Sequence, residues 1–267
     1  MRSREFRLEG GDRNVGTAYL PVDTQKPSPV LIACHGWKFH RALTPFTTAL
    51  VERLTARGMF VVTLDFFGCG ETGGDYAEMT YGRWAENVAA VFAEVATWDT
   101  VDAARIGCLG ISSGSTAALR FARDERRAAF VVSVATCLGL YINMPHSPAR
   151  TLSENMETLL SGGTARVFDV RFPLTFFTDF VQHAPLYDVQ EIACPVLFLQ
   201  GAEDNVWRRS DAWTGNALRQ RANAATWHVE IEGGDHGLDS RPKESVDALE
   251  HWLEGRGMLG ASVRPVS

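Results

Sequence analysis

Basic residues are not in excess in this 267-residue chain, and its apolar runs are short. Its 26 Lys and Arg residues against 32 Asp and Glu residues give a net charge of −6, so it lacks the positive surface typical of proteins that bind nucleic acids or anionic membranes. The longest apolar-leaning run, 128–142, is interrupted by Ser133 and Thr136 and is shorter than the roughly 20 residues that cross a bilayer as a helix. We therefore expect no nucleic-acid partner and no membrane partner.

Cysteine is also scarce. The five cysteines are widely spaced, without a C-x-x-C pair, and we interpret them as buried free thiols in a reducing compartment. Charged residues interrupt the N-terminal stretch, which therefore has no signal-peptide core, and we expect a cytoplasmic protein. The sequence contains no H-E-x-x-H, no clustered Cys and His ligands and no G-x-x-x-x-G-K-[ST] motif. It predicts neither a metal site nor a cofactor.

The sequence does contain an alternation of short β-rich runs and helical segments. Apolar residues make up 45% of the chain, enough for a sizeable buried core. The β-rich runs are 30–34, 59–64, 105–109, 130–134, 196–200 and 226–231. Between them apolar residues recur at helical spacing, as at Phe46, Leu50 and Leu54. This pattern predicts an α/β fold with a mostly parallel central sheet and helices on both faces.

Two segments depart from this alternation. At the N-terminus, apolar and charged residues alternate around Gly10-Gly11-Asp12, which predicts an antiparallel hairpin at the sheet edge. Later, about 60 residues separate the fourth run from the fifth, and a connection of that length needs its own structure or a function. We therefore predict an inserted cap at 137–185, within a core formed by 1–136 and 186–267.

The predicted cap carries a series of phenylalanines. Phe168, Phe172, Phe176 and Phe180 recur every fourth residue, but Pro173 argues against one straight helix. Such a stripe either faces a substrate cleft or packs the cap onto the sheet. Candidate substrate contacts are Phe172, Phe176 and Trp207.

A candidate nucleophile lies directly after the third β-rich run. Gly110-Ile111-Ser112-Ser113-Gly114 is a G-x-S-x-G pentapeptide, and a predicted helix follows it. This strand–turn–helix setting exposes a serine above the sheet, provided that the residues two before and two after it lack bulky side chains. Gly110 and Gly114 meet that requirement.

A serine hydroxyl needs a general base, and the base needs an orienting acid. Asp204 follows the fifth run and His236 follows the sixth. Because the carboxyl ends of neighbouring strands meet at one crevice, we expect Ser112, Asp204 and His236 to converge. Their order along the chain is the one expected for α/β-hydrolases. Glu203 and Asp65 are alternative acids.

An oxyanion formed by this attack needs two hydrogen-bond donors. One candidate is the backbone N–H of Ser113, the residue after the nucleophile. The other is the backbone N–H of Trp37, which follows His35-Gly36 at the end of the first run. The alternative is that His35-Gly36 forms only a turn.

Taken together, these motifs resemble the α/β-hydrolase superfamily, in its small serine esterase branch of feruloyl and cinnamoyl esterases and dienelactone-hydrolase relatives. The resemblance implies a Ser-His-Asp hydrolase with a cap inserted in the core fold. Thr72 stands where serine is frequent in the branch, and Ser112 stands where dienelactone hydrolases carry cysteine. The segments that carry the resemblance are 35–37, 65–70, 110–114, 201–204 and 234–237.

The expected activity is hydrolysis of a small carboxylic ester through an acyl-enzyme on Ser112. The same residues also fit a thioesterase, an amidase, a carbon–carbon bond hydrolase or an acyltransferase. A binding protein without turnover is disfavoured, because every catalytic position holds a competent residue. The expected partner is a small-molecule ester or thioester, and a homodimer is compatible with the sequence.

Overall fold

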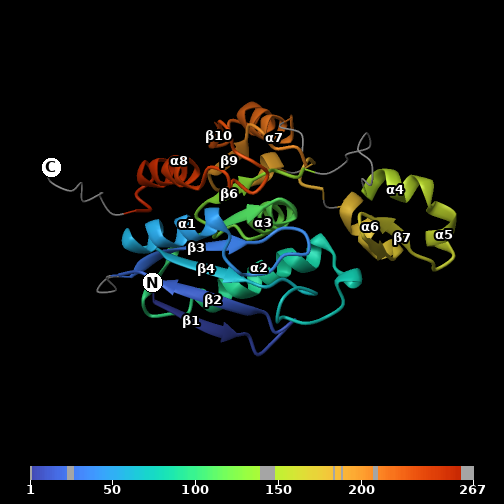
Figure 1. The fold of residues 1–267 in the computed structure, drawn as a ribbon, viewed down its shortest axis with the longest axis horizontal. Helices are drawn as coiled ribbons and strands as arrows, with labels where there is room; N and C mark the ends of the chain where they lie inside the picture. The colour runs from blue at the N-terminus through green and yellow to red at the C-terminus, as the bar shows by residue number, and fades with distance from the viewer. Residues whose placement is uncertain are drawn as a thin grey trace.

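A central eight-stranded β-sheet organises the chain (Figure 1). The computed structural model describes residues 2–22, 27–138, 148–182, 184–187, 189–206 and 210–259. The strands lie in the order β1-β2-β4-β3-β5-β6-β9-β10, and neighbouring strands from β4 to β10 are parallel, which confirms the mostly parallel sheet. Their bounds are β1 (Arg2–Arg7), β2 (Val15–Leu20), β3 (Ser28–Cys34), β4 (Phe60–Leu64), β5 (Val101–Ile111), β6 (Val131–Val134), β9 (Val196–Gly201) and β10 (Thr226–Ile231).

Helices cover both faces of this sheet. α1 and α8 pack against one face, and α2, α3 and α7 cover the other. Successive residues of β3 alternate between the two sides, since Leu31 joins the α1–α8 cluster and Ile32 joins the opposite one. None of the helices in the described part of the chain has the length and apolar character needed to cross a membrane. The helix bounds are α1 (Pro45–Ala56), α2 (Tyr81–Val95), α3 (Ser113–Asp124), α7 (Ser210–Arg221) and α8 (Pro242–Glu254).

The N-terminal residues form the predicted hairpin. β1 pairs with β2 in antiparallel register, and β2 pairs antiparallel with β4. β1 is the outermost strand on this side of the sheet. The hairpin therefore extends the parallel core at one edge.

The connection between β6 and β9 holds elements of its own, which we call the insert. Figure 1 shows α4, α5, β7 and α6 gathered at one end of the molecule. Phe168 lies in the turn between two short strands, Phe172 ends the second strand, and Phe176 lies on the helix that follows Pro173. The prediction that the phenylalanines do not share one straight helix is confirmed. The bounds are α4 (Pro148–Glu154), α5 (Met156–Leu160), β7 (Ala165–Val167), β8 (Val170–Phe172), α6 (Leu174–Gln182) and the 3₁₀ turn η2 (Val189–Glu191).

A partly buried carboxylate connects the insert to the core. Asp179 of α6 accepts from the backbone N–H of Gly82, in the first turn of α2, and pairs with Arg120 of α3 at 3.0 Å. A negative charge at a helix N-terminus is favourable, because the first N–H groups of the helix have no acceptor within it. One side chain thus joins α6 to α2 and α3. The predicted limits of the cap, 137 and 185, remain a prediction, since residues 139–147 and 183 lie outside the described part.

Candidate active site

Ser112 stands at a sharp turn between β5 and α3. Its φ of +56° and ψ of −124° place a non-glycine residue in a strained conformation. The turn is tight: a Cβ on Gly110 would lie 2.2 Å from the carbonyl oxygen of Gly114, and one on Gly114 would lie 2.2 Å from that of His35. Both positions require glycine because the backbone of another segment passes too close for a side chain. The sequence pattern predicted that these two positions must lack bulky side chains.

His236 and Asp204 meet at the carboxyl ends of β10 and β9. Nδ1 of His236 lies 2.9 Å from Oδ2 of Asp204. The carboxylate is fully buried and accepts two more hydrogen bonds, from Nε2 of Gln200 at 2.9 Å and from the backbone N–H of Val206 at 2.8 Å. Because a carboxylate only accepts, Nδ1 of His236 is the donor. The other ring nitrogen, Nε2, is therefore the basic one in the neutral imidazole.

The alternative acids lie elsewhere. Glu203 is exposed, and Asp65 is buried in a different cluster with Arg41. Asp204, the preferred acid among those proposed from the sequence, contacts the imidazole. The structure thus brings together the predicted base and the preferred acid.

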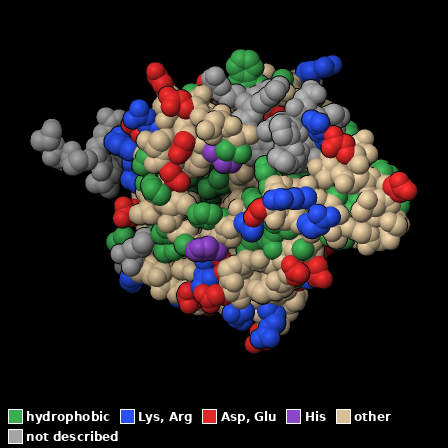
Figure 2. Space-filling model, turned by 45° about the vertical axis from the view of Figure 1, so that its right-hand side comes forward, with side chains coloured by type: hydrophobic (Ala, Val, Ile, Leu, Met, Phe, Trp, Pro, Cys, Tyr) green, Lys and Arg blue, Asp and Glu red, His purple; other side chains and the backbone are tan. Residues whose placement is uncertain are grey.

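A cavity of about 420 Å³ opens over the serine, a volume suited to small-molecule ligands. Its lining includes Ser112, Ser113, His236 and Trp37, which come from three segments: the turn between β5 and α3, the loop after β10 and the loop after β3. Figure 2 shows a face of the molecule on which hydrophobic side chains gather near histidine side chains. The predicted nucleophile, base and both predicted oxyanion residues therefore border one cavity, with Asp204 behind the base.

The peptide of Trp37 is fixed beside the nucleophile. A Cβ on Gly36 would lie 3.2 Å from Cβ of Ser112, so this backbone passes directly against the serine. Nδ1 of His35 lies 2.8 Å from the carbonyl oxygen of Gly36, and Nε2 accepts from the backbone N–H of Phe66 at 3.2 Å. In a trans peptide the N–H points opposite to the C=O. By holding the Gly36 carbonyl on one side, His35 directs the Trp37 N–H to the other.

The ring of His35 is kept neutral. It is 7% exposed and packs edge-on against Phe66 and Trp84. Burial lowers the pKa of His35 from 6.5 to about 4. Its two hydrogen bonds require one donor and one acceptor nitrogen, which only the neutral ring provides. The sequence pattern left open whether His35-Gly36 belongs to an oxyanion loop or forms only a turn. In the structure, the neutral ring of His35 holds the peptide that carries the candidate donor N–H of Trp37.

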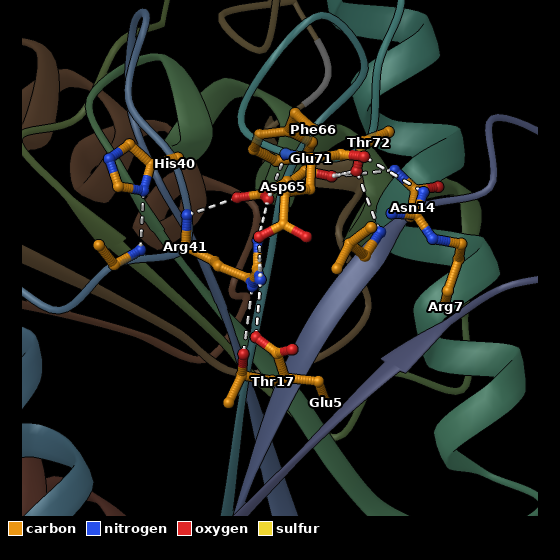
Figure 3. Close-up of polar contacts among 12 residues, drawn as sticks. Glu5, Arg7, Asn14, Thr17, His40, Arg41, Asp65, Phe66, Glu71 and Thr72 are labelled. Carbon is orange, nitrogen blue, oxygen red and sulfur yellow. Dashed lines mark hydrogen bonds and ion pairs between the residues drawn. The ribbon is translucent and has the colours of Figure 1, made fainter.

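Arg41 anchors the loop after β3 (Figure 3). Its guanidinium pairs with the buried Asp65 and, at 2.8 Å each, with Glu5 and Glu71. Its backbone N–H also donates to Asp65 at 2.6 Å. Burial alone would lower the pKa of Arg41, but these carboxylates raise it above its ordinary value. The network joins the loop after β3 to β1 and to the segment after β4. Asp65 therefore serves as the buried partner of Arg41.

Aromatic rings surround the indole of Trp37. The ring centroids of Tyr76, Phe168 and Phe172 lie 5.4, 5.5 and 5.6 Å from it, all nearly edge-to-face. Phe172 and Phe176 stack on each other at 4.0 Å and are fully buried.

The structure changes the picture of the predicted substrate contacts. Phe172 and Phe176 pack behind Trp37 and are not part of the cavity lining, because they belong to the buried core that attaches the insert. Phe168, which sequence reasoning did not select, does line the cavity. Its place in a two-residue turn between short strands is the one local signal that sets it apart. Trp207 lies outside the described residues.

Thiol and metal chemistry are not apparent at this site. All five cysteines are free and buried, as predicted. Cys34 lines the cavity, but burial raises the pKa of its thiol well above the ordinary value, so it stays protonated. Within the described ranges, no group of three or more His, Cys, Asp or Glu side chains is placed to hold a metal ion.

The chain is similar to known protein sequences. A model described as "Alpha/beta hydrolase family" matches residues 30–248. The mouse protein named "Palmitoyl-protein thioesterase ABHD10, mitochondrial" is 25% identical over 169 residues, which cover 61% of this chain and 55% of the mouse sequence. An uncharacterised 31.7 kDa protein of Escherichia coli is 22% identical over 212 residues, covering 67% of this chain and 73% of that protein. The chain thus spans about half the length of the mouse thioesterase that it matches.

Solved structures give the same result for the fold. The structure titled "Ferulic Acid bound to Est1E from Butyrivibrio proteoclasticus" superposes with a TM-score of 0.76 at 19% identity, over 91% of this chain and 96% of that one. The structure of mouse "Alpha/beta hydrolase domain-containing protein 10" gives 0.71 at 17% identity, over 95% and 99%. Likeness at these identities establishes a shared fold. The family match over residues 30–248 confirms the resemblance seen in the sequence motifs.

Proposed function

The chain belongs to the alpha/beta hydrolase family, and we propose that it is a serine hydrolase that cleaves a small carboxylic ester through an acyl-enzyme on Ser112. The observation that carries this proposal is the 2.9 Å contact between His236 and Asp204, beside the cavity that contains Ser112. A base held in one tautomer by a buried carboxylate, facing a strained serine, is the arrangement that nucleophilic acyl transfer requires.

The first half-reaction forms the acyl-enzyme. Oγ of Ser112 attacks the ester carbonyl carbon, and Nε2 of His236 takes the hydroxyl proton. Asp204, already desolvated and hydrogen-bonded, stabilises the imidazolium without reorganising. The carbonyl oxygen becomes an oxyanion, and the backbone N–H groups of Trp37 and Ser113 bind it. The tetrahedral intermediate collapses, the C–O bond breaks, and His236 gives its proton to the leaving alcohol.

The second half-reaction releases the acid. Water attacks the acyl-enzyme while His236 takes one of its protons, and the same two N–H groups hold the second oxyanion. Collapse of this intermediate returns the proton to Oγ of Ser112. Because Ser113 begins α3, its N–H has no acceptor within the helix and lies at the positive end of the helix dipole.

A thioester is the second candidate substrate class. The named activity of the mouse relative, palmitoyl-protein thioesterase, favours it, and the apolar lining of the cavity suits an acyl chain. The mechanism is the same, except that a thiolate leaves and takes its proton from His236. An amide, a carbon–carbon bond or transfer of the acyl group to an alcohol would use the same acyl-enzyme chemistry.

A fluorophosphonate probe tests the proposal directly. Wild-type protein should be labelled on Ser112 and should hydrolyse p-nitrophenyl butyrate, whereas Ser112→Ala should show neither. Ser161→Ala, a change at an exposed serine of the insert, serves as the matched control and should behave as wild type. Folded wild-type protein that is not labelled and does not turn over would instead identify a binding protein. Product analysis with a butyryl thioester as substrate, and with an alcohol added as acyl acceptor, then shows whether the enzyme also cleaves thioesters or transfers the acyl group.

A further inference from the structure

The entrance of the cavity is formed by exposed hydrophobic side chains. Phe39, Phe168 and Val206 line the cavity and are nevertheless 46%, 39% and 40% exposed. A side chain that both lines a cavity and reaches solvent lies at its opening. These three residues come from the loop after β3, from the insert and from the loop that carries Asp204. Among the lining residues, Phe168 is the contribution of the insert.

The charged and imidazole side chains of the lining already contact other groups of the protein. Arg41 pairs with three carboxylates. Oδ1 of Asp239 accepts from the backbone N–H of Phe46 at 2.9 Å, and Nδ1 of His40 accepts from that of Ala42 at 3.3 Å. The surface that remains for a ligand is mainly apolar. It therefore suits an uncharged hydrocarbon group, which is selected by shape.

Phe168 is held in an unfavourable backbone conformation. It is the first residue of the two-residue turn between β7 and β8, and its φ is +52°. Glycine is usual at a turn position with positive φ, and a bulky aromatic residue there is an outlier. Strain of this kind persists where the surroundings impose it, and it marks functional positions.

Three contacts impose the conformation of this turn. Nε of Arg166 donates to the carbonyl oxygen of Phe168 at 2.7 Å. Asp169, the next residue, pairs with Lys38 of the loop after β3 at 2.6 Å. The ring of Phe168 lies edge-to-face against Trp37 at 5.5 Å. Phe168 and Trp37 therefore form one aromatic wall of the cavity.

We propose that Phe168 is a specificity-determining residue, which limits the width of the acyl group that reaches Ser112. The inference rests on the proposed function. A smaller residue at this position widens the entrance, and a larger one narrows it. Glycine would relieve the positive φ but would also remove the ring that packs against Trp37, so the readout that identifies a selecting residue is the ratio of rates for two acyl groups.

The test compares a narrow and a wide acyl group on one leaving group. For p-nitrophenyl butyrate and p-nitrophenyl 2,2-dimethylpropanoate, the ratio of kcat/KM values, wide over narrow, is measured in wild type, Phe168→Gly and Phe168→Trp. We expect the ratio to rise about tenfold in Phe168→Gly and to fall about tenfold in Phe168→Trp. Leu160→Ala, at an exposed position of the insert outside the lining, is the control and should leave the ratio unchanged.

The outcomes separate this inference from the function on which it rests. If the fluorophosphonate labels Ser112 but the ratio stays within twofold across all variants, Phe168 does not select substrates. If Phe168→Gly lowers Tm and slows both esters equally, the residue is structural. If wild type is neither labelled nor active on either ester, the proposed function fails, and the inference fails with it.

Discussion

Acid should destabilise the fold through His35. The folded protein holds this ring neutral until about pH 4, whereas an unfolded chain takes up the proton near pH 6.5. Between these values the unfolded state binds more protons, so stability falls as the pH falls. At about 1.4 kcal/mol for each pKa unit, the difference between 6.5 and about 4 corresponds to a loss of about 3 kcal/mol between pH 7 and pH 4. Stability above pH 6.5 should not depend on this group.

The assay is urea unfolding at intervals from pH 7 to pH 4. Protonated carboxylates also destabilise the protein in this range, so the comparison is with His35→Gln, which lacks the titrating ring and loses part of its hydrogen bonding. The variant should be less stable at pH 7, and the gap to wild type should close by about 3 kcal/mol at pH 4. His251→Gln, at an exposed helical position, is the control and should follow wild type. A constant gap between wild type and His35→Gln at every pH would refute the reasoning.

Other predictions concern stability and rate. Arg219 is fully buried and donates to four backbone carbonyls, so Arg219→Met should cost about 3–5 kcal/mol in urea unfolding, and a loss below 1 kcal/mol would contradict that role. Gly114→Ala places a Cβ 2.2 Å from the His35 carbonyl and should cost about 3 kcal/mol; an unchanged Tm would show that the turn relaxes. Asp204→Asn should lower kcat about 10⁴-fold with folding retained, and near-wild-type turnover would show that another residue orients His236.

The central strands were predictable because they are covered on both faces. Such strands carry nearly continuous apolar runs, and the run 196–200 falls within β9, whose residues are all buried. Helix α7 was not predicted, because its buried positions do not form an apolar stripe. Arg219 occupies one of them, fully buried, where the pattern would require an apolar residue. A buried arginine satisfied by backbone carbonyls depends on the segment that packs over it, which the sequence of the helix does not reveal.

The positions of Ser112, His236 and Asp204 followed from strand ends, because parallel strands place their carboxyl ends at one edge. The roles of the phenylalanines could not be read in the same way. Their four-residue spacing suggests one shared face, but a turn, a strand end and a helix carry Phe168, Phe172 and Phe176 instead. Which phenylalanine ring lines the cavity depends on how the β7–β8 turn packs on the loop after β3. That packing is a tertiary contact, which the spacing of the phenylalanines does not reveal.

Trp37 connects the two parts of the site. Its indole packs against rings of the insert, whereas its backbone N–H is directed by His35 of the core. The side chain of Trp37 is therefore positioned by the insert, and its peptide is positioned by the core. Because Gly36 lies against Cβ of Ser112, a displacement of the indole would be transmitted to a backbone with no free space beside the nucleophile. The shape of the entrance and the geometry of the proposed oxyanion donor are thus coupled through a single residue.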